Sequence, residues 1–440
     1  NADLVLLAAS PPELEVYSDL RGLAINWPGS FEKAPTEAAP LRLTLDSSVK
    51  DGVAFGVNWE NRGHGYVRTL DTGFEARVDY VQLGRSRLSD INISALDLNR
   101  QWTVRLDSDL VNGRIEIPQD GSELTVDLQH LNVPRNDSQD PTPTAAANLR
   151  DSANSDAAAG LKLQDWPSAN VRIAQLALAG EPLGQWSFLL RPQPGGVNIG
   201  SIKGKLDSLA LAGEFNWLLL GQNQVSRFTG SVTGGQLAEL GGLFGADIPL
   251  ENLATNIELA LEWPGRPDQF SLKRLSGDIS MTLEDGVILQ QNNSAQLFRV
   301  FNLLNTDTLW RRLQLDFSDL YERGVAFDAL SGKAQIANGR LTLDPELQIV
   351  GPSGAFKLSG TTDMASETLD MRLVVVVPLT QNLPLAALLM GAGAPIGGAL
   401  FVLDKLLGDP LSKLTSASYK VSGTWDEPQT NLQGVFGAGD

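Results

Sequence analysis

Few side chains in this sequence could carry out covalent chemistry. The 440 residues include no cysteine and only two histidines, His64 and His130. Disulfides and thiolate metal sites are therefore excluded. Two histidines are also almost too few for a Ser-His-Asp triad or a histidine-rich metal site. His64 lies in a turn-like Asn-Arg-Gly-His-Gly segment and His130 ends an alternating segment, so we interpret both as surface residues.

One pair of acidic residues is spaced closely enough to suggest acid–base chemistry. Asp316 and Asp319 stand close together, but Glu322 and Arg323 follow them, and the segment is typical of a solvated turn. Paired-acid catalysis needs two carboxylates that face each other across a substrate cleft. Phosphate-loop, dinucleotide and His-Glu-x-x-His motifs are also missing. We therefore predict a protein that is not an enzyme, with no catalytic residues, no cofactor and no metal.

The charge balance limits the partners of the protein. The sequence has 34 Lys and Arg residues against 52 Asp and Glu residues, a net charge of −18. Nucleic acids and anionic membrane surfaces bind positively charged protein surfaces. We therefore expect that the protein does not bind nucleic acid, and does not bind a membrane through charge. Residue 1 is Asn and no Lys- or Arg-led apolar segment follows, which favours a mature product or an excised fragment.

Most of the chain alternates apolar and polar residues with period two, the pattern of β-strands with one buried and one wetted face. The dipeptides Asn112-Gly113, Asp120-Gly121, Asp285-Gly286 and Asn338-Gly339 stand between such runs and favour the positive φ of hairpin turns. We therefore predict an antiparallel sheet built by sequential hairpins. The apolar members of the alternating runs include Val53, Phe55, Val57, Leu124, Val126, Leu128, Trp186, Phe188, Leu190, Ile257, Leu259, Leu261, Ile279, Met281, Leu283, Leu369, Met371, Leu373 and Val375.

Three stretches depart from this pattern. Residues 134–160 are rich in Asp, Asn, Ser, Ala and Pro, as in a flexible insertion. From Leu297 the apolar residues follow the i, i+3, i+4, i+7 spacing of an amphipathic helix. The segment Leu383–Leu403 has no charge for 21 positions, enough to span a bilayer core of about 30 Å. Glycines and Pro395 interrupt it, which favours two short helices over one span.

The apolar side of the predicted sheet must be covered by a second layer, close on itself, or hold something apolar. Two short helical stretches are too little for a second layer. Two alternatives remain from the residues alone. The first, which periodicity by itself favours, is a sandwich or barrel filled by its own side chains. The second is a long sheet folded into a groove that holds lipid acyl chains.

Several segments resemble a known family. They are residues 297–304 (Leu-Phe-Arg-Val-Phe-Asn-Leu-Leu), 309–320, 324–328, 377–385 and 414–428, the last ending in Thr-Trp-Asp-Glu-Pro. In combination they resemble the carboxy-terminal region of the AsmA-like, TamB-like bridge-like lipid-transfer proteins. The resemblance extends from about Trp166 to Pro428, and before the insertion it rests on pattern alone.

The resemblance implies a mainly β fold, an elongated antiparallel sheet folded into a hydrophobic, taco-like groove with short C-terminal helices. It implies non-vesicular phospholipid transport between the inner and outer membranes of a Gram-negative envelope. It further implies a periplasmic location, an inner-membrane anchor in a missing N-terminal part, and a C-terminus near the outer membrane. A structural or adhesive β-rich envelope protein with a self-filled core is the alternative, and a polymer hydrolase would need an acidic cleft that we do not find.

The expected organisation follows from these patterns and the resemblance. The groove segments are residues 1–133, 161–292 and 324–379, with a flexible insertion at 134–160, an amphipathic helical insertion at 293–323, an apolar helical hairpin at 380–415, and a final strand and tail at 416–440. The alternating apolar residues are the expected acyl-chain contacts. We expect the hairpin to dip into the outer membrane or cap the groove, with a buried helical pair or a full span as alternatives. Its expected membrane contacts are Leu385, Leu388, Leu389, Ile396, Leu400, Phe401 and Leu403.

Overall fold

The computed structural model is almost entirely β-structure. It describes residues 13–25, 33–46, 52–60, 62–83, 86–133, 166–221, 223–241, 248–289, 324–352, 354–378, 414–425 and 427–437. These residues form 24 strands and divide into two compact units, unit 1 (residues 1–193) and unit 2 (residues 194–440). The mainly β fold expected from the period-two alternation is confirmed.

Unit 1 contains thirteen strands. They are β1 (Glu13–Ser18), β2 (Leu41–Asp46), β3 (Ala54–Trp59), β4 (Gly63–Leu70), β5 (Gly73–Leu83), β6 (Ser86–Leu98), β7 (Gln101–Asp107), β8 (Val111–Pro118), β9 (Leu124–Val133), β10 (Ala169–Ile173), β11 (Leu176–Leu178), β12 (Glu181–Pro182) and β13 (Gln185–Gln193). From β1 to β9 each strand pairs antiparallel with the next, as sequential hairpins require.

The order in which the strands pair no longer follows the sequence after β9. Strands β10 and β11 both pair with β9 in parallel, and β10 pairs antiparallel with β13. A parallel neighbour cannot be joined by a tight hairpin, so it needs a longer connection. The change falls where the chain contains the predicted flexible insertion, which lies outside the described residues. The prediction of sequential hairpins is therefore wrong from β9 to β13 of unit 1, where, among the described strands, only β11 and β12 pair as consecutive antiparallel strands.

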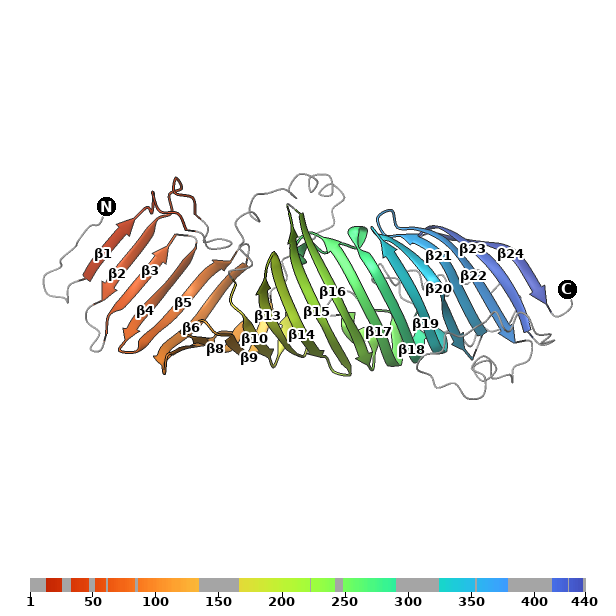
Figure 1. The fold of residues 1–440 in the computed structure, drawn as a ribbon, viewed down its shortest axis with the longest axis horizontal. Coiled ribbons are helices and arrows are strands. Elements are labelled where there is room, and N and C mark those ends of the chain that lie inside the picture. Colours follow the sequence, from red (N-terminus) through yellow and green to blue (C-terminus); the bar gives the residue numbers. More distant parts are fainter. Residues whose placement is uncertain are drawn as a thin grey trace. The chain divides into compact units, whose positions relative to one another are not determined.

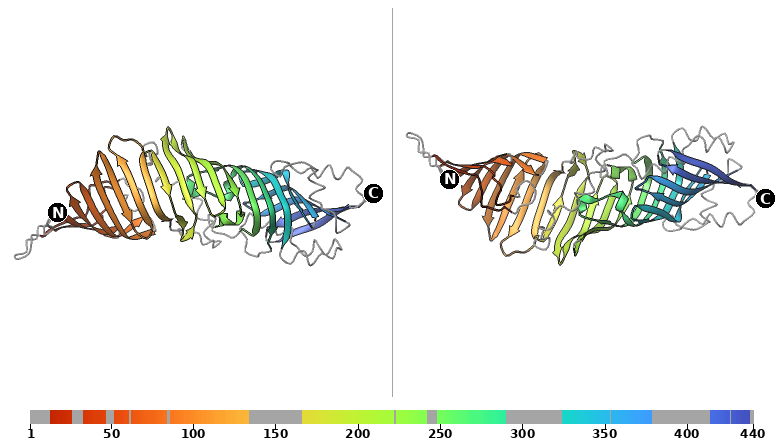
Figure 2. Two further views of the ribbon diagram at one scale, coloured as in Figure 1. Left: turned by 90° about the horizontal axis from the view of Figure 1, so that it is seen from below. Right: turned by 90° about the horizontal axis from the view of Figure 1, so that it is seen from above.

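Unit 2 contains eleven strands, each paired antiparallel with the next (Figure 1). They are β14 (Gly196–Lys205), β15 (Leu209–Leu220), β16 (Asn223–Gly234), β17 (Leu250–Pro264), β18 (Ser276–Ile288), β19 (Val325–Ala337), β20 (Arg340–Gly351), β21 (Gly354–Asp363), β22 (Thr368–Pro378), β23 (Leu414–Thr424) and β24 (Pro428–Gly437). Two further views show the strands of each unit side by side in this order (Figure 2). Sequential hairpins are confirmed here.

Helix in the described residues is limited to short 3-10 turns. They are η6 (Leu237–Leu240), η7 (Pro267–Gln269) and η8 (Leu272–Arg274). The two predicted helical segments, residues 293–323 and 380–413, lie outside the described residues, and residues 414 and 415 already belong to β23. No helix in the described part of the chain is long and apolar enough to cross a bilayer.

Two of the four predicted hairpin turns lie inside strands instead, and one of these is a bulge. Asp120-Gly121 and Asn338-Gly339 lie in turns, with φ of 78° at Gly121 and 80° at Gly339. Asn112-Gly113 lies inside β8, where the register with β9 shifts. Asp285 has φ of 46° but lies inside β18. A β-bulge accepts a residue with positive φ as readily as a hairpin turn does, which explains the error.

Candidate functional site

The two faces of the unit 2 sheet differ in chemistry. In β17, Ile257, Leu259 and Leu261 alternate with Glu258 and Ala260, so the two sets point to opposite sides. We call the side that carries Leu259 the apolar face and the side that carries Glu258 the polar face. Unit 1 has the same division, and there the apolar face is the side that carries Phe55.

Strand register joins the predicted apolar residues of unit 2 into rows across the sheet. Leu259 is the direct partner of Ile279, and Ile257 is the partner of Met281. One row contains Gly213, Gly230, Leu259, Ile279, Ala334, Leu343, Gly360, Met371 and Val421. A second row lies on the other side of the Ile257–Met281 pair. It contains Leu209, Gly234, Thr255, Leu283, Leu330, Ile349, Phe356, Val375 and Ala417. Leu261, Leu369 and Leu373 occupy the same face through the alternation of β17 and β22.

The predicted residues of unit 1 also share a face. Val126 of β9 pairs with Val171 of β10, which pairs with Phe188 of β13. The flanking triples are Leu124, Ala169 and Leu190, and Leu128, Ile173 and Trp186. The nine side chains belong to one hydrophobic cluster. The prediction that the two alternating runs of β9 and β13 lie on a common face therefore agrees with the strand register.

The β3 residues extend this face towards the N-terminal strands. Phe55 is opposite Leu45 and Val67, and Val57 is opposite Leu43 and Gly65. Val53 precedes β3 and is 38% exposed, so it lies at the border of the sheet and not within a row. Of the predicted residues, Val53 has the weakest structural support as a member of the face.

Burial changes along the apolar face. Phe55, Val57 and Val126 in unit 1, and Leu259 in unit 2, are only partly buried. Leu283 and Leu373 are 0% exposed and Val375 is 1% exposed. A partly buried aliphatic row retains surface that another apolar molecule can cover, whereas a fully buried row has lost it. The chain therefore has an accessible and a packed portion of the same face.

Sequence reasoning missed several members of the face. In β10, Val171 and Ile173 alternate with Arg172. This short apolar-polar-apolar alternation is itself a signal for a strand, and it could have identified both residues. In the packed portion the missed residues are Leu330, Ile349, Phe356, Leu358, Tyr419 and Val421. Tyr419 occupies the place of an aliphatic residue between Leu373 and Leu432. Strand β19 was harder to recognise because both of its faces contain buried residues at the Val325 end.

Charge is almost absent from the apolar face of unit 2. Asp285 and Asp328 lie beyond Leu283 and Leu330 along β18 and β19, at the point where the buried side chains change to Ile288, Phe327 and Val325. Burial raises the pKa of Asp328, and the nearby Asp285 charge raises it further. Elsewhere the described rows present aliphatic, aromatic, glycine and uncharged polar residues, so the face has no described cation that would bind a phosphate.

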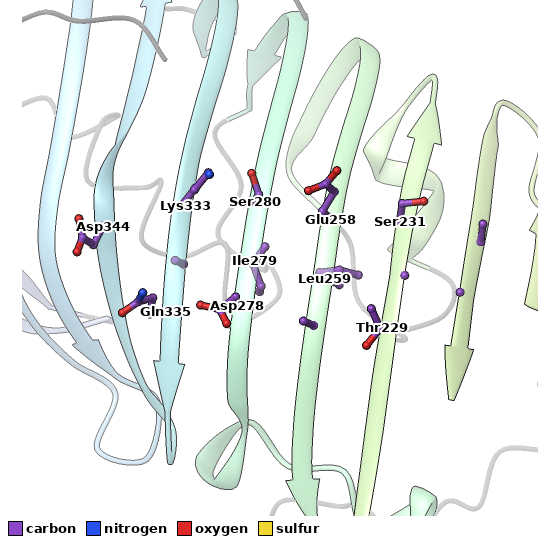
Figure 3. A pocket seen from close by; sticks show the side chains of 15 residues that line it. Thr229, Ser231, Glu258, Leu259, Asp278, Ile279, Ser280, Lys333, Gln335 and Asp344 are labelled. Carbon is purple, nitrogen blue, oxygen red and sulfur yellow. The ribbon is translucent and has the colours of Figure 1, made fainter. Parts of the chain in front are cut away.

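The polar face of unit 2 has a hollow lined by residues of the six strands β15 to β20. The hollow measures about 690 Å³ and is bordered by two rows of polar-face residues. Figure 3 shows Ser231, Glu258, Ser280 and Lys333 in one row and Thr229, Asp278 and Gln335 in the other. Leu259 of β17 and Ile279 of β18 lie between the two rows and contribute to its lining. The hollow therefore belongs to the wetted side of the sheet and is distinct from the apolar face.

The residues first considered for catalysis do not form a reactive centre in the described structure. His64 lies in β4, not in a turn, and its Nδ1 is 2.6 Å from Asp79 Oδ2. Its ring stacks on Tyr80 with centroids 6.4 Å apart, so it is half-buried and not a plain surface residue. His130 lies half-buried in β9. Asp316 and Asp319 lie outside the described residues, as do the seven expected membrane contacts from Leu385 to Leu403.

Comparisons with known proteins place these features in context. The family model described as YhdP protein matches residues 67–430 of the chain. The protein of Escherichia coli (strain K12) named intermembrane phospholipid transporter YhdP is 26% identical over 275 residues, which cover 62% of this chain and 21% of that relative. The chain thus spans about a fifth of the length of this curated relative. No solved structure matches the chain.

Proposed function

The chain belongs to the YhdP family, and from this premise we propose that it moves phospholipids between the inner and outer membranes of a Gram-negative cell envelope. Transport is non-vesicular: acyl chains slide along the apolar face while headgroups stay in water at its margin. The name of the E. coli relative supports the phospholipid substrate. A protein of this family is not an enzyme, in agreement with the missing catalytic motifs.

The observation that carries the proposal is the apolar face itself. Its rows run in register from β15 to β23 of unit 2, and the rows through Leu259 and Leu283 contain no charged residue. Each acyl CH₂ exposed to water costs about 0.8 kcal/mol, so an apolar surface lowers the barrier to crossing an aqueous space. Aliphatic side chains offer no directional bonds, so a lipid is not held at one position.

The partly buried portion of the face is the better candidate for lipid contact. Phe55, Val126 and Leu259 keep exposed apolar area that an acyl chain can cover. A groove that closes around the lipid would deepen this contact, and we include such a groove, formed by folding of the sheet, in the proposal. All of the predicted alternating residues remain candidates, with those of unit 1 and β17 first.

The packed portion favours the second candidate function, a structural or adhesive envelope protein with a self-filled core. Leu330 and Val421 are 0% exposed, as a core filled by its own side chains requires. The two readings differ in one measurable respect. A lipid carrier retains phospholipid in contact with the apolar face, and a structural protein does not.

Location follows from the proposed task. The protein spans the periplasm, with an inner-membrane anchor elsewhere in the full-length protein and its C-terminal end near the outer membrane. The uncharged Leu383–Leu403 segment contacts that membrane or caps the groove. Liposome flotation with and without residues 380–410 tests this part, and equal flotation removes the membrane role.

Site-specific photocrosslinking in cells tests lipid contact directly. A photoreactive amino acid is placed at Leu259 in the full-length protein, and at the adjacent Glu258 on the polar face as the matched control. We expect phospholipid adducts, identified by mass spectrometry, at Leu259 and not at Glu258. Equal labelling at both positions, or none at Leu259 together with no phospholipid in detergent-free purified protein, would favour the structural function.

A further inference from the structure

The polar face of unit 1 carries a second hollow, which is lined by arginines. It measures about 380 Å³. Two register rows border it. The first is Arg68, Glu75, Ser94 and Arg105, and the second is Tyr66, Arg77, Asn92 and Asp107, each on β4, β5, β6 and β7 in that order. We call this site the arginine hollow. It faces away from Phe55 and the apolar face.

The hollow exists because β6 carries short side chains between two strands with long ones. Ser94 and Asn92 form its floor, while Arg77 stands on β5 and Arg105 on β7. Neighbouring strands lie about 4.8 Å apart, so β5 and β7 are separated by about 10 Å. A tetrahedral oxyanion fits into this gap, within reach of guanidinium groups from both sides and of the Ser94 hydroxyl and Asn92 amide below.

The charges of the hollow favour an anion. Three arginines meet two carboxylates in its lining, a surplus of one positive charge in a chain of net charge −18. The carboxylate of Asp107 already accepts a hydrogen bond of 2.8 Å from Asn112. Arg77 Nε is 3.6 Å from Asp79 Oδ1, whereas Arg68 and Arg105 make no ion pair with any described residue. Arg105 is thus available to a ligand, and Arg77 also keeps its N–H donors for one, because 3.6 Å is too long for a hydrogen bond.

A like-charged neighbour strengthens the case. Arg105 stands directly opposite Arg114 of β8, and like charges at directly opposite positions destabilise a sheet. Arg114 is 3.2 Å from Glu116, so its own charge is matched, while that of Arg105 is not. An anion bound on the β6 side of Arg105 would compensate this charge.

We propose that the arginine hollow binds one phosphate group. Arg77 and Arg105 contact its oxygens from opposite sides, because a guanidinium presents paired N–H donors that match phosphate geometry. Ser94 Oγ–H and Asn92 Nδ2–H donate from the floor. Glu75 and Asp107 would repel an extended polyanion, which limits the ligand to a single phosphate. The phosphate belongs either to a phospholipid headgroup or to free phosphate.

Calorimetric titration of the purified 440-residue chain tests the site at low ionic strength, since salt screens exposed charges. One arm uses inorganic phosphate, and the other uses glycerophosphoglycerol, a soluble phosphodiester without acyl chains. We expect Arg105→Gln to weaken binding about tenfold, as loss of a charged hydrogen-bond partner does. The matched control Arg114→Gln, one strand outside the hollow, is expected to change affinity less than about twofold.

The two arms separate the sources of the phosphate. Binding of the diester supports a lipid headgroup, and binding of inorganic phosphate alone supports free phosphate. Ser94→Asp, which places a carboxylate on the floor, should abolish binding in either case. Absence of binding in both arms, or equal losses in Arg105→Gln and Arg114→Gln, would overturn the proposal. Lipid contact at Leu259 would be unaffected, because that residue lies in unit 2 and on the apolar face.

Discussion

Asp285 and Asp328 stand opposite each other across β18 and β19, two carboxylates beside the most deeply buried row of the apolar face. Glu284 pairs with Ala329 and Gly286 pairs with Phe327, which brings the two aspartates together. On their other side Leu283 pairs with Leu330, and both leucines are 0% exposed. The apolar row is therefore bordered by a pair of like charges, one of which has a raised pKa.

This pair makes stability depend on pH. The pKa of Asp328 is raised above its ordinary value of 3.8, first by burial and second by Asp285. A carboxyl with a raised folded-state pKa binds its proton more tightly in the folded protein. The free energy of unfolding therefore falls as pH rises from about 4 through the raised pKa. The loss persists at neutral pH, where the Asp328 carboxylate is charged.

Asp328→Asn should accordingly stabilise the protein at pH 7, by less than about 1 kcal/mol because the group is partly solvated. Near pH 3, where Asp328 is protonated, the variant and the parent should be equally stable. Urea denaturation at the two pH values measures this difference. Asp278→Asn, on the exposed polar face of the neighbouring strand β18, is the control and should not show this difference. If Asp328→Asn and the parent are equally stable at pH 7, repulsion between Asp328 and Asp285 does not lower the stability of the protein.

A charge on the apolar face should interrupt transport, and the same charge on the polar face should not. Leu259→Asp places a carboxylate where a passing acyl chain would strip it of water, which costs a few kcal/mol. We expect at least a several-fold loss of phospholipid transport in cells that depend on the full-length protein. Ala260→Asp, one residue away and exposed on the polar face, is the matched control. Undiminished transport by Leu259→Asp, at normal protein level, would contradict a lipid track at this position.

The packed portion of the face should respond as a protein core does. Leu373 is 0% exposed between Leu358 and Tyr419, and Leu432, at 47% exposed, lies beyond Tyr419 in the same row. We expect Leu373→Ala to cost about 2–5 kcal/mol of stability, since it leaves a cavity. Leu432→Ala should cost within about 0.5 kcal/mol. Hydrogen-exchange protection of β22 and β23 measures both, and similar effects of the two substitutions would mean that Leu373 is not part of a tight core.

The apolar face could be predicted from the sequence because alternation is a local property. Once Ile257, Leu259 and Leu261 alternate with polar neighbours, strand geometry alone places them on one side. Antiparallel pairing then puts them beside Ile279 and Met281, because a slip of one residue would turn one apolar set towards the solvent. This reasoning needs no knowledge of distant contacts, and it was sufficient for most of the candidate site.

Other features depend on contacts that a local pattern does not contain. The parallel pairing of β9 with β10 joins segments separated by the long insertion, so no turn signal marks it. Asp285-Gly286 has the composition of a hairpin turn, but paired strands on both sides keep it inside β18. His64 reads as a loop residue among glycines, yet Tyr80 and Asp79 of the next strand hold it in β4.

The turn between β21 and β22 provides a prediction with the opposite pH dependence. Asp363 Oδ1 accepts hydrogen bonds from the backbone N–H and the hydroxyl of Ser366, at 2.9 and 3.0 Å, and from Ala365 N at 3.0 Å. These bonds, led by that from Ser366 N–H, hold the pKa of Asp363 below its ordinary value of 3.8. Such a carboxylate contributes stability above pH 3.8, and the contribution disappears as pH falls through the lowered folded-state pKa.

Asp363→Ala should therefore destabilise the β21–β22 hairpin at pH 7 and have a smaller effect near pH 2, because the parent loses its charge as pH falls through the lowered pKa of Asp363. Asp363→Asn should fall between the parent and the alanine variant at pH 7, because an amide oxygen still accepts hydrogen bonds but without the charge that strengthens them. Hydrogen exchange of the β21 and β22 amides, with the pKa of Asp363 followed by NMR, distinguishes the three proteins. A loss of protection in Asp363→Ala that is as large at pH 2 as at pH 7 would show that the charge of Asp363 does not support the turn.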